Sequence, residues 1–94
     1  MPNAVVYSSA FCPYCVRAKD LLTRKGVKYE EIRTDIERDR MVEMMERSQR
    51  RTVPQIFIDD FHVGGFDDMA ELDMEGKLDG LLCVPESDFD DEVT

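Results

Sequence analysis

The sequence predicts one small α/β domain whose elements follow the order βαβαββα. Short apolar runs rich in β-branched residues, which are typical of buried strands, alternate with segments whose apolar residues recur at helical spacing. Two of the apolar runs are separated by only two residues, which is the spacing of a β-hairpin. A chain of 94 residues has room for one hydrophobic core, so a second catalytic domain is excluded.

Residues 1–32 predict a strand, a helix and a second strand. Residues 4–8 are apolar and β-branched, which suits a buried strand. The helix should run from about Pro13 to Lys25, because Gly26 is a natural C-terminal stop. One face of this helix is expected to carry Tyr14, Ala18, Leu21 and Leu22. Residues 27–32 indicate the second strand, and a connection through a helix makes the two strands parallel.

The rest of the chain predicts a second helix, a hairpin and one or two closing helices. Methionines recur at helical spacing between Asp35 and about Ser48, and we interpret them as core residues rather than a ligand site, because Met fills irregular gaps. Residues 55–58 and 61–63, separated by two aspartates, indicate the hairpin. The closing helical segment is expected to be interrupted at two glycines, Gly76 and Gly80.

The charge balance excludes several classes of partner. The formal net charge is −9, from 12 basic and 21 acidic residues, so neither nucleic acid nor a membrane surface is expected as a partner. No apolar run approaches the roughly 20 residues that span a bilayer. The N-terminal residues lack the basic start and the long apolar stretch of a secretory signal, and we therefore expect a cytoplasmic protein.

The end of the chain is strongly acidic. Residues 86–94 contain five acidic residues and no basic one, as a solvated chain end commonly does. We therefore divide the chain into a domain, residues 1–85, and an acidic C-terminal tail, residues 86–94. The tail is expected to be disordered, and we assign it no function.

Three cysteines carry the chemical signal. Cys12 and Cys15 form a Cys-Pro-Tyr-Cys unit, whereas Cys83 lies near the other end of the chain. The odd number and the expected reducing compartment argue against a disulfide scaffold. A structural zinc site is disfavoured because the other candidate ligands, His62 and Cys83, lie about 20 residues apart without a second paired motif. A pair that follows a buried strand and opens a helix is typical of a redox-active dithiol.

The helix start distinguishes the two thiols of this pair. Cys12 would be the N-cap, where unpaired backbone N–H groups and the positive end of the helix dipole stabilise a thiolate. Pro13 suits the first helical position because it lacks the donor that would go unused there. Cys12 is therefore predicted to be the attacking nucleophile. Cys15, three residues further along the same face, can reach the first sulfur and is predicted to be the resolving thiol.

Three motifs at fitting spacing resemble the dithiol glutaredoxins, particularly the small bacterial type. They are Cys12-Pro13-Tyr14-Cys15, the Thr-Val-Pro-Gln-Ile-Phe-Ile segment at 52–58, and Val-Gly-Gly at 63–65 followed by two aspartates. The resemblance covers nearly all of residues 1–83. It implies a thioredoxin-like α/β fold, with a four-stranded mixed sheet flanked by helices, which agrees with the predicted element order.

The resemblance also implies an activity and its partners. It implies a glutathione-dependent oxidoreductase that reduces protein disulfides and glutathione mixed disulfides, with glutathione as cosubstrate and with no metal expected. The implied partners are glutathione and disulfide-containing or glutathionylated proteins, among them reductases that need electrons, such as ribonucleotide reductase. The protein is expected to be a monomer.

Glutathione contacts follow from the same resemblance. Val53 would offer backbone hydrogen bonds to the cysteinyl unit, Thr52 would lie beside it, and Pro54 would follow a cis peptide bond facing the active site. Gly65 would permit a close backbone approach. The γ-glutamyl end would be held by Phe66, Asp67 and Asp68, and the groove would be flanked by Tyr14.

One position departs from the family pattern. The family commonly has a Lys three residues before the first Cys, where it helps to hold a glutathione carboxylate, and this chain has Ser9. Arg51, Arg50 and Gln55 lie next to the Thr-Val-Pro segment, and we expect them to take that carboxylate, since an Arg fork suits a carboxylate better than Lys does. A solvated surface position is the alternative for either arginine.

Two residues have plainer interpretations. His62 alternates with apolar neighbours and is predicted to be a partly exposed strand residue rather than a ligand or a base. Cys83 lies among Leu81, Leu82 and Val84, which predicts a small core residue, with a regulatory thiol as the alternative.

Two other functions stay open from the sequence. The first is an iron-sulfur cluster binding module in which Cys12 from two subunits and two glutathiones hold the cluster. Pro13 argues against it, because in the resembling family cluster binding is commoner with other residues after the first Cys. The second is a thioredoxin-like reductant fed directly by a flavoprotein, against which stand the implied glutathione contacts at 52–55 and 65–68.

Overall fold

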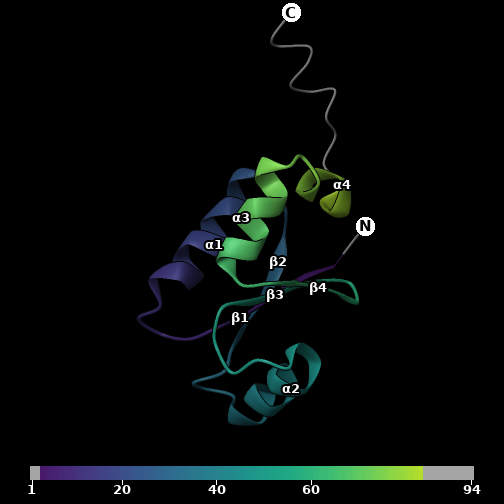
Figure 1. Ribbon diagram of the computed structural model, residues 1–94. Coiled ribbons are helices and arrows are strands. Elements are labelled where there is room, and N and C mark those ends of the chain that lie inside the picture. The colour runs from purple at the N-terminus through teal and green to yellow at the C-terminus, as the bar shows by residue number, and fades with distance from the viewer. Residues whose placement is uncertain (1–2, 84–94) are drawn as a thin grey trace, which may run out of the picture.

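The computed structural model describes residues 3–83, which contain four strands and four helices in the predicted order (Figure 1). The elements are β1 (Ala4–Ser8), α1 (Pro13–Arg24), β2 (Tyr29–Arg33), α2 (Arg38–Ser48), β3 (Gln55–Ile58), β4 (Phe61–Gly64), α3 (Phe66–Met74) and α4 (Leu78–Leu82). The predicted acidic tail at 86–94 and the end of the predicted domain lie outside the described residues. None of the helices in residues 3–83 has the length and apolar character needed to cross a membrane.

The strands form one mixed sheet with the order β2-β1-β3-β4. β1 and β2 are parallel, as the predicted helical connection requires, with Val6 opposite Glu31. β3 is antiparallel to β1 and brings Ile56 opposite Val6, while β4 returns antiparallel to β3 as the predicted hairpin. An irregularity in the pairing follows Ile56, so the register of β4 shifts by one position beside the Thr-Val-Pro segment.

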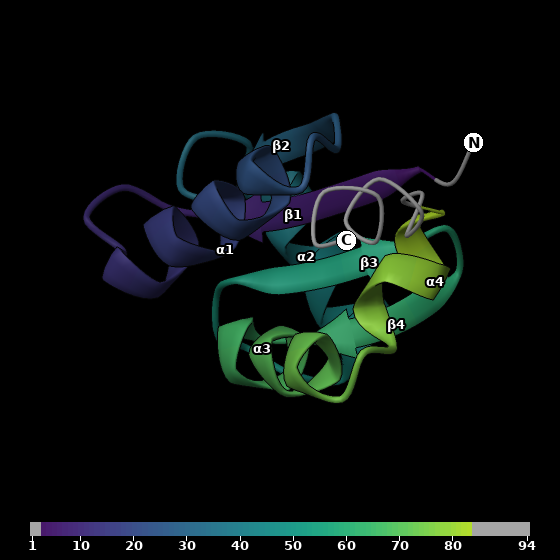
Figure 2. The same ribbon diagram turned by 90° about the horizontal axis from the view of Figure 1, so that it is seen from above.

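Helices cover both faces of the sheet. α1 and α3 lie on one face and α2 on the other (Figure 1). Seen from above, α1 and α3 lie side by side over the sheet, with α1 nearer β1 and α3 nearer β4 (Figure 2). Alternating strand residues supply the two cores, because successive side chains of a strand point to opposite faces. Val6 and Ile56 pack under α1 and α3, whereas Val5, Tyr7 and Phe57 pack against Met44 of α2.

A polar network fixes α2 against the sheet. The hydroxyl group of Tyr7, which is fully buried, donates to Glu43 and accepts a hydrogen bond from Arg47 Nη1 at 3.0 Å. The Arg47 guanidinium also lies 4.0 Å from the ring centroid of Phe57. Burial, with the carboxylate of Glu43 second, raises the pKa of Tyr7 above its ordinary value. Because α2 is fixed against the sheet, the end of α2 at Ser48 is fixed as well, and the arginines at 50 and 51 follow directly after it.

The first helix ends as predicted. Gly26 has φ +73°, a left-handed conformation that favours glycine, and its N–H donates to the Thr23 carbonyl at 2.9 Å. The N–H of Val27 donates to the Leu22 carbonyl at 3.0 Å, which completes a Schellman motif. Because Val27 serves the helix end, β2 begins at Tyr29 rather than at the predicted residue 27.

Other predicted boundaries and burials are confirmed only in part. α2 begins at Arg38 rather than at Asp35, because the Asp35 carboxylate accepts a hydrogen bond from the Ala10 N–H at 3.1 Å and holds a turn there. Gly76, with φ +77°, separates α3 from α4 as predicted, whereas Gly80 lies inside α4. Of the predicted core methionines, Met44 is fully buried and Met41 and Met45 are half-buried.

Two side chains with apolar neighbours on their helices are exposed. Tyr14 is 52% exposed in the first turn of α1, where its ring packs against Phe66 and the Arg17 guanidinium. Cys83 is also exposed, so the prediction of a core residue is wrong. Its backbone is the left-handed cap of α4, beyond the last turn that packs on the core.

Candidate active site

The start of α1 positions both cysteines of the dithiol. Cys12 is the N-cap of α1 in an extended conformation, Pro13 occupies the first helical position, and the N–H of Cys15 donates to Cys12 Sγ at 3.2 Å. Cys12 and Cys15 are joined by a disulfide with Cα atoms 5.2 Å apart. Cys15 is buried and Cys12 is half-buried. Of the two sulfurs, that of Cys12 belongs to the more accessible residue.

The Thr-Val-Pro segment lies directly beside this disulfide. Cys12 Sγ is 3.8 Å from the carbonyl oxygen of Val53. The peptide bond between Val53 and Pro54 is cis, which confirms the geometry that the resemblance implied. Phe11, the residue before Cys12, is fully exposed with φ +56°. Cys12 Sγ therefore lies beside the backbone of the Thr-Val-Pro segment, and the residue before Cys12 exposes an aromatic ring.

A groove of about 220 Å³ begins at this segment. Three parts of the chain line it: the start of α1, the stretch that leads into β3, and the start of α3. The lining residues are Tyr14, Arg50, Thr52, Val53, Pro54, Gln55, Gly65, Phe66, Asp67 and Asp68. The structure thus brings together the glutathione contacts that the sequence predicted, Arg50 among them, except Arg51. Their roles toward glutathione remain predictions.

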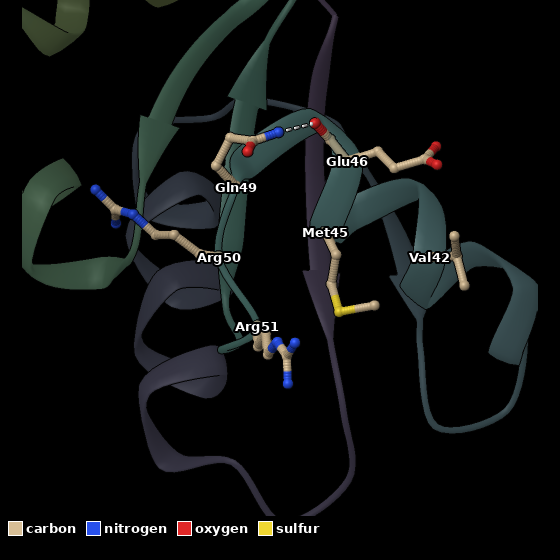
Figure 3. Close-up of a pocket in the computed structure, with 6 residues that line it drawn as sticks. All are labelled: Val42, Met45, Glu46, Gln49, Arg50 and Arg51. Atoms are coloured by element: carbon tan, nitrogen blue, oxygen red, sulfur yellow. Dashed lines mark hydrogen bonds between the residues drawn. The ribbon is translucent and has the colours of Figure 1, made fainter.

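Arg51 lies in a separate hollow of about 370 Å³ beside the end of α2. Val42, Met45, Glu46 and Gln49 line the same hollow, with Arg50 at its edge (Figure 3). Figure 3 shows the side chains of Arg50 and Arg51 pointing in different directions. Only Arg50 reaches across to α3, so the structure does not bring Arg51 into the groove.

Asp68 is the anchored anion of the groove. Its Oδ2 accepts a hydrogen bond from the N–H of Gly65 at 2.9 Å and pairs with Arg50 Nη1 at 3.0 Å. The bond from Gly65, followed by that from Arg50, holds the pKa of Asp68 below its usual range. The position in the first turn of α3 also suits a negative charge. Asp68 is therefore ionised at neutral pH and faces the groove.

Gly64 is a site residue that the sequence reasoning missed. Its φ is +112°, and a Cβ atom there would lie 2.3 Å from Asp68 Oδ2 and 2.8 Å from Asp68 Cγ. A Cβ on Gly65 would instead meet ordinary contacts, the nearest at 3.6 Å from the Pro54 carbonyl oxygen. The Gly-Gly pair signalled this tight approach, but the steric requirement within the protein falls on the first glycine.

Gln55 supports the groove through hydrogen bonds to Thr52. Its side chain is fully buried, and its Nε2 donates to the carbonyl oxygen of Thr52 at 3.0 Å and to the Thr52 hydroxyl at 3.3 Å. The amide oxygen lies 2.7 Å from Nε2 of His62, a half-buried strand residue as predicted. The donors of Gln55 are thus engaged within the protein, which disfavours the predicted role of holding a glutathione carboxylate.

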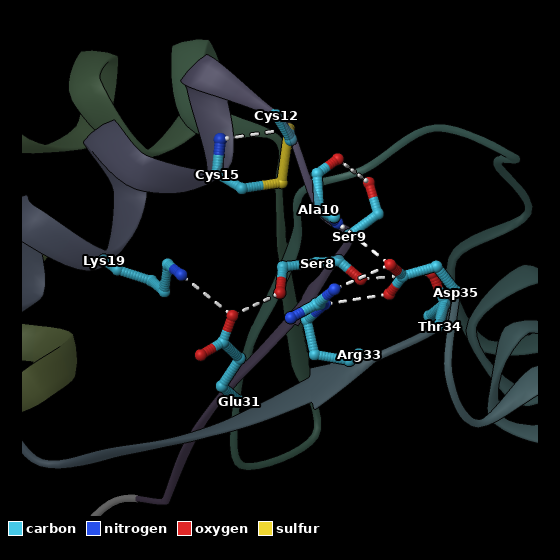
Figure 4. A network of polar contacts seen from close by, with 10 residues as sticks. All are labelled: Ser8, Ser9, Ala10, Cys12, Cys15, Lys19, Glu31, Arg33, Thr34 and Asp35. Atoms are coloured by element: carbon cyan, nitrogen blue, oxygen red, sulfur yellow. Dashed lines mark hydrogen bonds and ion pairs between the residues drawn. A yellow bond between two sulfur atoms is a disulfide. The ribbon is translucent and has the colours of Figure 1, made fainter.

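A second hollow, of about 480 Å³, lies on the Ser9 side of the disulfide and is lined by Cys12, Cys15, Lys19, Glu31 and Arg33 among others. Its charges are paired (Figure 4): Lys19 Nζ is 2.8 Å from Glu31 Oε2, and Arg33 forms two bonds of 2.8 and 2.7 Å with Asp35. Lys19, and then the Ser8 hydroxyl at 2.6 Å, lower the pKa of Glu31. Arg33 lowers the pKa of Asp35 in the same way.

The family comparisons agree with this geometry. The family model for glutaredoxins matches residues 4–63. A glutaredoxin of Pseudomonas aeruginosa is 50% identical over 84 residues, which span 89% of this chain and 100% of that protein. Glutaredoxin 3 of Escherichia coli is 51% identical over 82 residues, which span 87% of this chain and 99% of that protein.

Solved structures show the same similarity. The solution structure of a glutaredoxin from Brucella melitensis has a TM-score of 0.77 and 51% identity, covering 87% of this chain and 89% of that one. The crystal structure of a buckwheat glutaredoxin–glutathione complex has a TM-score of 0.80 and 35% identity, covering 87% of this chain and 77% of that one. These similarities confirm the predicted thioredoxin-like fold, with its four-stranded mixed sheet between helices.

Proposed function

The chain belongs to the glutaredoxin family, of the small bacterial dithiol type, and is a glutathione-dependent thiol-disulfide oxidoreductase; on this premise we propose that Cys12 and Cys15 reduce glutathione mixed disulfides and protein disulfides. The observation that supports this most directly is the placement of Cys12 Sγ 3.8 Å from the Val53 carbonyl oxygen. That carbonyl lies at the edge of a groove whose other wall carries Asp68. A peptide held along residues 52–55 would thus present its sulfur to Cys12.

For a glutathione mixed disulfide, Cys12 acts alone. The Cys12 thiolate attacks the glutathione sulfur, a new Cys12–glutathione disulfide forms, and the substrate thiol leaves as a thiolate that takes up a proton. A second glutathione thiolate then attacks the glutathione sulfur bound to Cys12. Cys12 leaves as a thiolate, and glutathione disulfide is released. The helix N-terminus and the N–H of Cys15 stabilise the Cys12 thiolate each time it leaves.

For a protein disulfide, Cys15 completes the reaction. Cys12 attacks one sulfur of the substrate and forms a mixed disulfide, and the thiolate of Cys15 then attacks Cys12 Sγ and releases the reduced protein. The resulting Cys12–Cys15 disulfide is the state seen in the structure. One glutathione reopens it by attack on Cys12, and a second glutathione removes the first. Two glutathiones are oxidised to glutathione disulfide for each protein disulfide reduced.

The groove offers complementary groups for glutathione. The γ-glutamyl end carries an ammonium and a carboxylate. Asp68 and Arg50, which form an ion pair at the start of α3, offer a carboxylate for the ammonium and a guanidinium for the carboxylate. The buckwheat relative was solved as a glutathione complex. We propose that Asp68 takes the ammonium and that the Thr52–Pro54 backbone takes the cysteinyl unit, with Tyr14 and Phe66 forming the apolar flank.

The test is turnover of a small glutathione mixed disulfide with glutathione, glutathione reductase and NADPH. We expect Cys12→Ser to fall to the uncatalysed rate, because no nucleophile remains, and Cys15→Ser to keep substantial activity. Cys83→Ser is the matched control, since it removes an exposed thiol away from the groove and should behave as wild type. Absence of turnover by wild type, or turnover with thioredoxin reductase in place of the glutathione system, would contradict the proposal.

A further inference from the structure

A chain of hydrogen bonds connects β4 to the segment that forms one wall of the groove. His62 Nε2 lies 2.7 Å from Gln55 Oε1, and Gln55 Nε2 donates to the carbonyl oxygen of Thr52 at 3.0 Å. Gln55 is fully buried, so water does not replace either partner. His62 belongs to β4, Gln55 begins β3, and Thr52 precedes the cis peptide bond. These hydrogen bonds therefore link the hairpin to Thr52, the residue before Val53, whose carbonyl oxygen lies beside Cys12 Sγ.

The direction of each hydrogen bond follows from the chemistry of its partners. A backbone carbonyl only accepts, so the amide nitrogen of Gln55 must face Thr52 and the amide oxygen must face His62. That oxygen also only accepts, so His62 must donate from Nε2. The neutral imidazole is thereby assigned to the tautomer that carries its proton on Nε2.

The sheet positions the imidazole ring of His62. The ring of His62 stacks on Phe57, with centroids 4.8 Å apart and planes 26° apart. Phe57 is itself buried and is contacted by the Arg47 guanidinium. Burial, followed by the charge of Arg50, lowers the pKa of His62; Asp68 opposes this effect and Arg47 adds to it. His62 is thus a rigid neutral donor at neutral pH.

We propose that His62 is a positioning residue for the glutathione groove, which it serves by fixing the Gln55 amide that holds Thr52. The proposal rests on the proposed function. Without the Nε2 donor, the buried oxygen of Gln55 either stays unpaired or the amide rotates and releases the Thr52 carbonyl. Because α1 builds the dithiol independently, the loss should affect glutathione binding more than the chemical step at Cys12.

Two substitutions separate this role from packing. His62→Phe keeps an aromatic ring against Phe57 but removes the donor. His62→Gln loses the ring but places a donor nitrogen the same number of bonds from the backbone as His Nε2. We expect His62→Phe to raise KM for the glutathione mixed disulfide about three- to tenfold, the loss of one hydrogen bond, with kcat within about twofold of wild type. His62→Gln should restore KM to within about twofold.

The outcomes distinguish the two proposals. An active wild type with an unchanged KM in His62→Phe overturns this inference alone, as does an equal rise in KM in both variants, because His62→Gln keeps a donor nitrogen. An inactive wild type contradicts the proposed function instead. Nitrogen-15 NMR of the His62 ring in wild type gives a test that needs no variant. A proton on Nε2 at neutral pH supports the inference, and a proton on Nδ1 contradicts it.

Discussion

The dithiol and the groove beside it are built in opposite ways. Cys12 and Cys15 belong to one helical turn, and their geometry depends on the N-cap, Pro13 and the N–H of Cys15. The groove is assembled from three distant parts of the chain and depends on the cis peptide bond before Pro54, the sheet register and Gly64. Substitutions in the groove should therefore impair binding and leave the reactivity of Cys12 nearly intact.

The two sides of the disulfide also differ in how their charges are held. On the Ser9 side, Lys19 pairs with Glu31 and Arg33 with Asp35, so this hollow has little charge to offer an anion. On the groove side, Arg50 and Asp68 are 47% and 45% exposed, and a pair so exposed contributes only about 0–1 kcal/mol. A zwitterionic ligand can therefore exchange partners with this pair at little cost.

Substitution of the adjacent glycines should give the largest difference within the groove. Gly64→Ala places a Cβ against Asp68 at a positive φ, and we expect a loss of about 3 kcal/mol in the free energy of unfolding, or displacement of Asp68 with a raised KM. Gly65→Ala, with φ −86°, should cost less than about 1 kcal/mol. Urea unfolding of both variants measures this, and equal losses would show that the close approach at Gly64 is unimportant.

The two arginines provide an intermediate effect. Arg50→Ala removes the partner of Asp68 and a charged wall of the groove, and we expect a three- to tenfold rise in KM for the glutathione mixed disulfide, which corresponds to about 1 kcal/mol, the upper end for an exposed ion pair. Arg51→Ala should change KM less than about twofold, since Arg51 lines a different hollow. A rise in Arg51→Ala that matches that of Arg50→Ala would restore the carboxylate role that the sequence predicted for Arg51.

Acid should give the smallest and most graded effect. Glu31, Asp35 and Asp68 have folded pKa values below their ordinary ones, so the stability they contribute is complete above the unfolded values and is lost as pH falls through the folded values. His62 also has a lowered pKa, so the unfolded state binds its proton more readily below about pH 6.5, and stability starts to fall there.

The contribution of His62 can be isolated. In His62→Gln, we expect the first decline in stability, between about pH 6.5 and the carboxylate range, to disappear while the later decline remains. Urea unfolding at successive pH values measures both declines. A first decline that persists in the variant would mean that another group, and not His62, takes up the proton.

Local patterns predicted most of the fold and the dithiol. The apolar runs of β1 and β3, the helical spacing in α1 and the helix stop at Gly26 each depend on neighbours a few residues away, and all were found where the sequence placed them. The start of α2 was predicted wrongly because Asp35 is held by Ala10, 25 residues earlier. Cys83 was assigned to the core by its neighbours in sequence, whereas exposure depends on what packs above each position.

The sequence by itself determined the element order, the parallel pairing of β1 with β2, and a cysteine pair at a helix start. The element order and the cysteine pair depend on interactions within a few residues, and the parallel pairing follows from a connection through a helix, so their causes can be identified along the chain. Only the tertiary structure decided that Arg50 rather than Arg51 faces Asp68, that Gly64 admits the Asp68 carboxylate, and that His62 orients Gln55. Those contacts join residues 4 to 18 positions apart, and their direction is set by sheet register and by hydrogen-bond geometry through space.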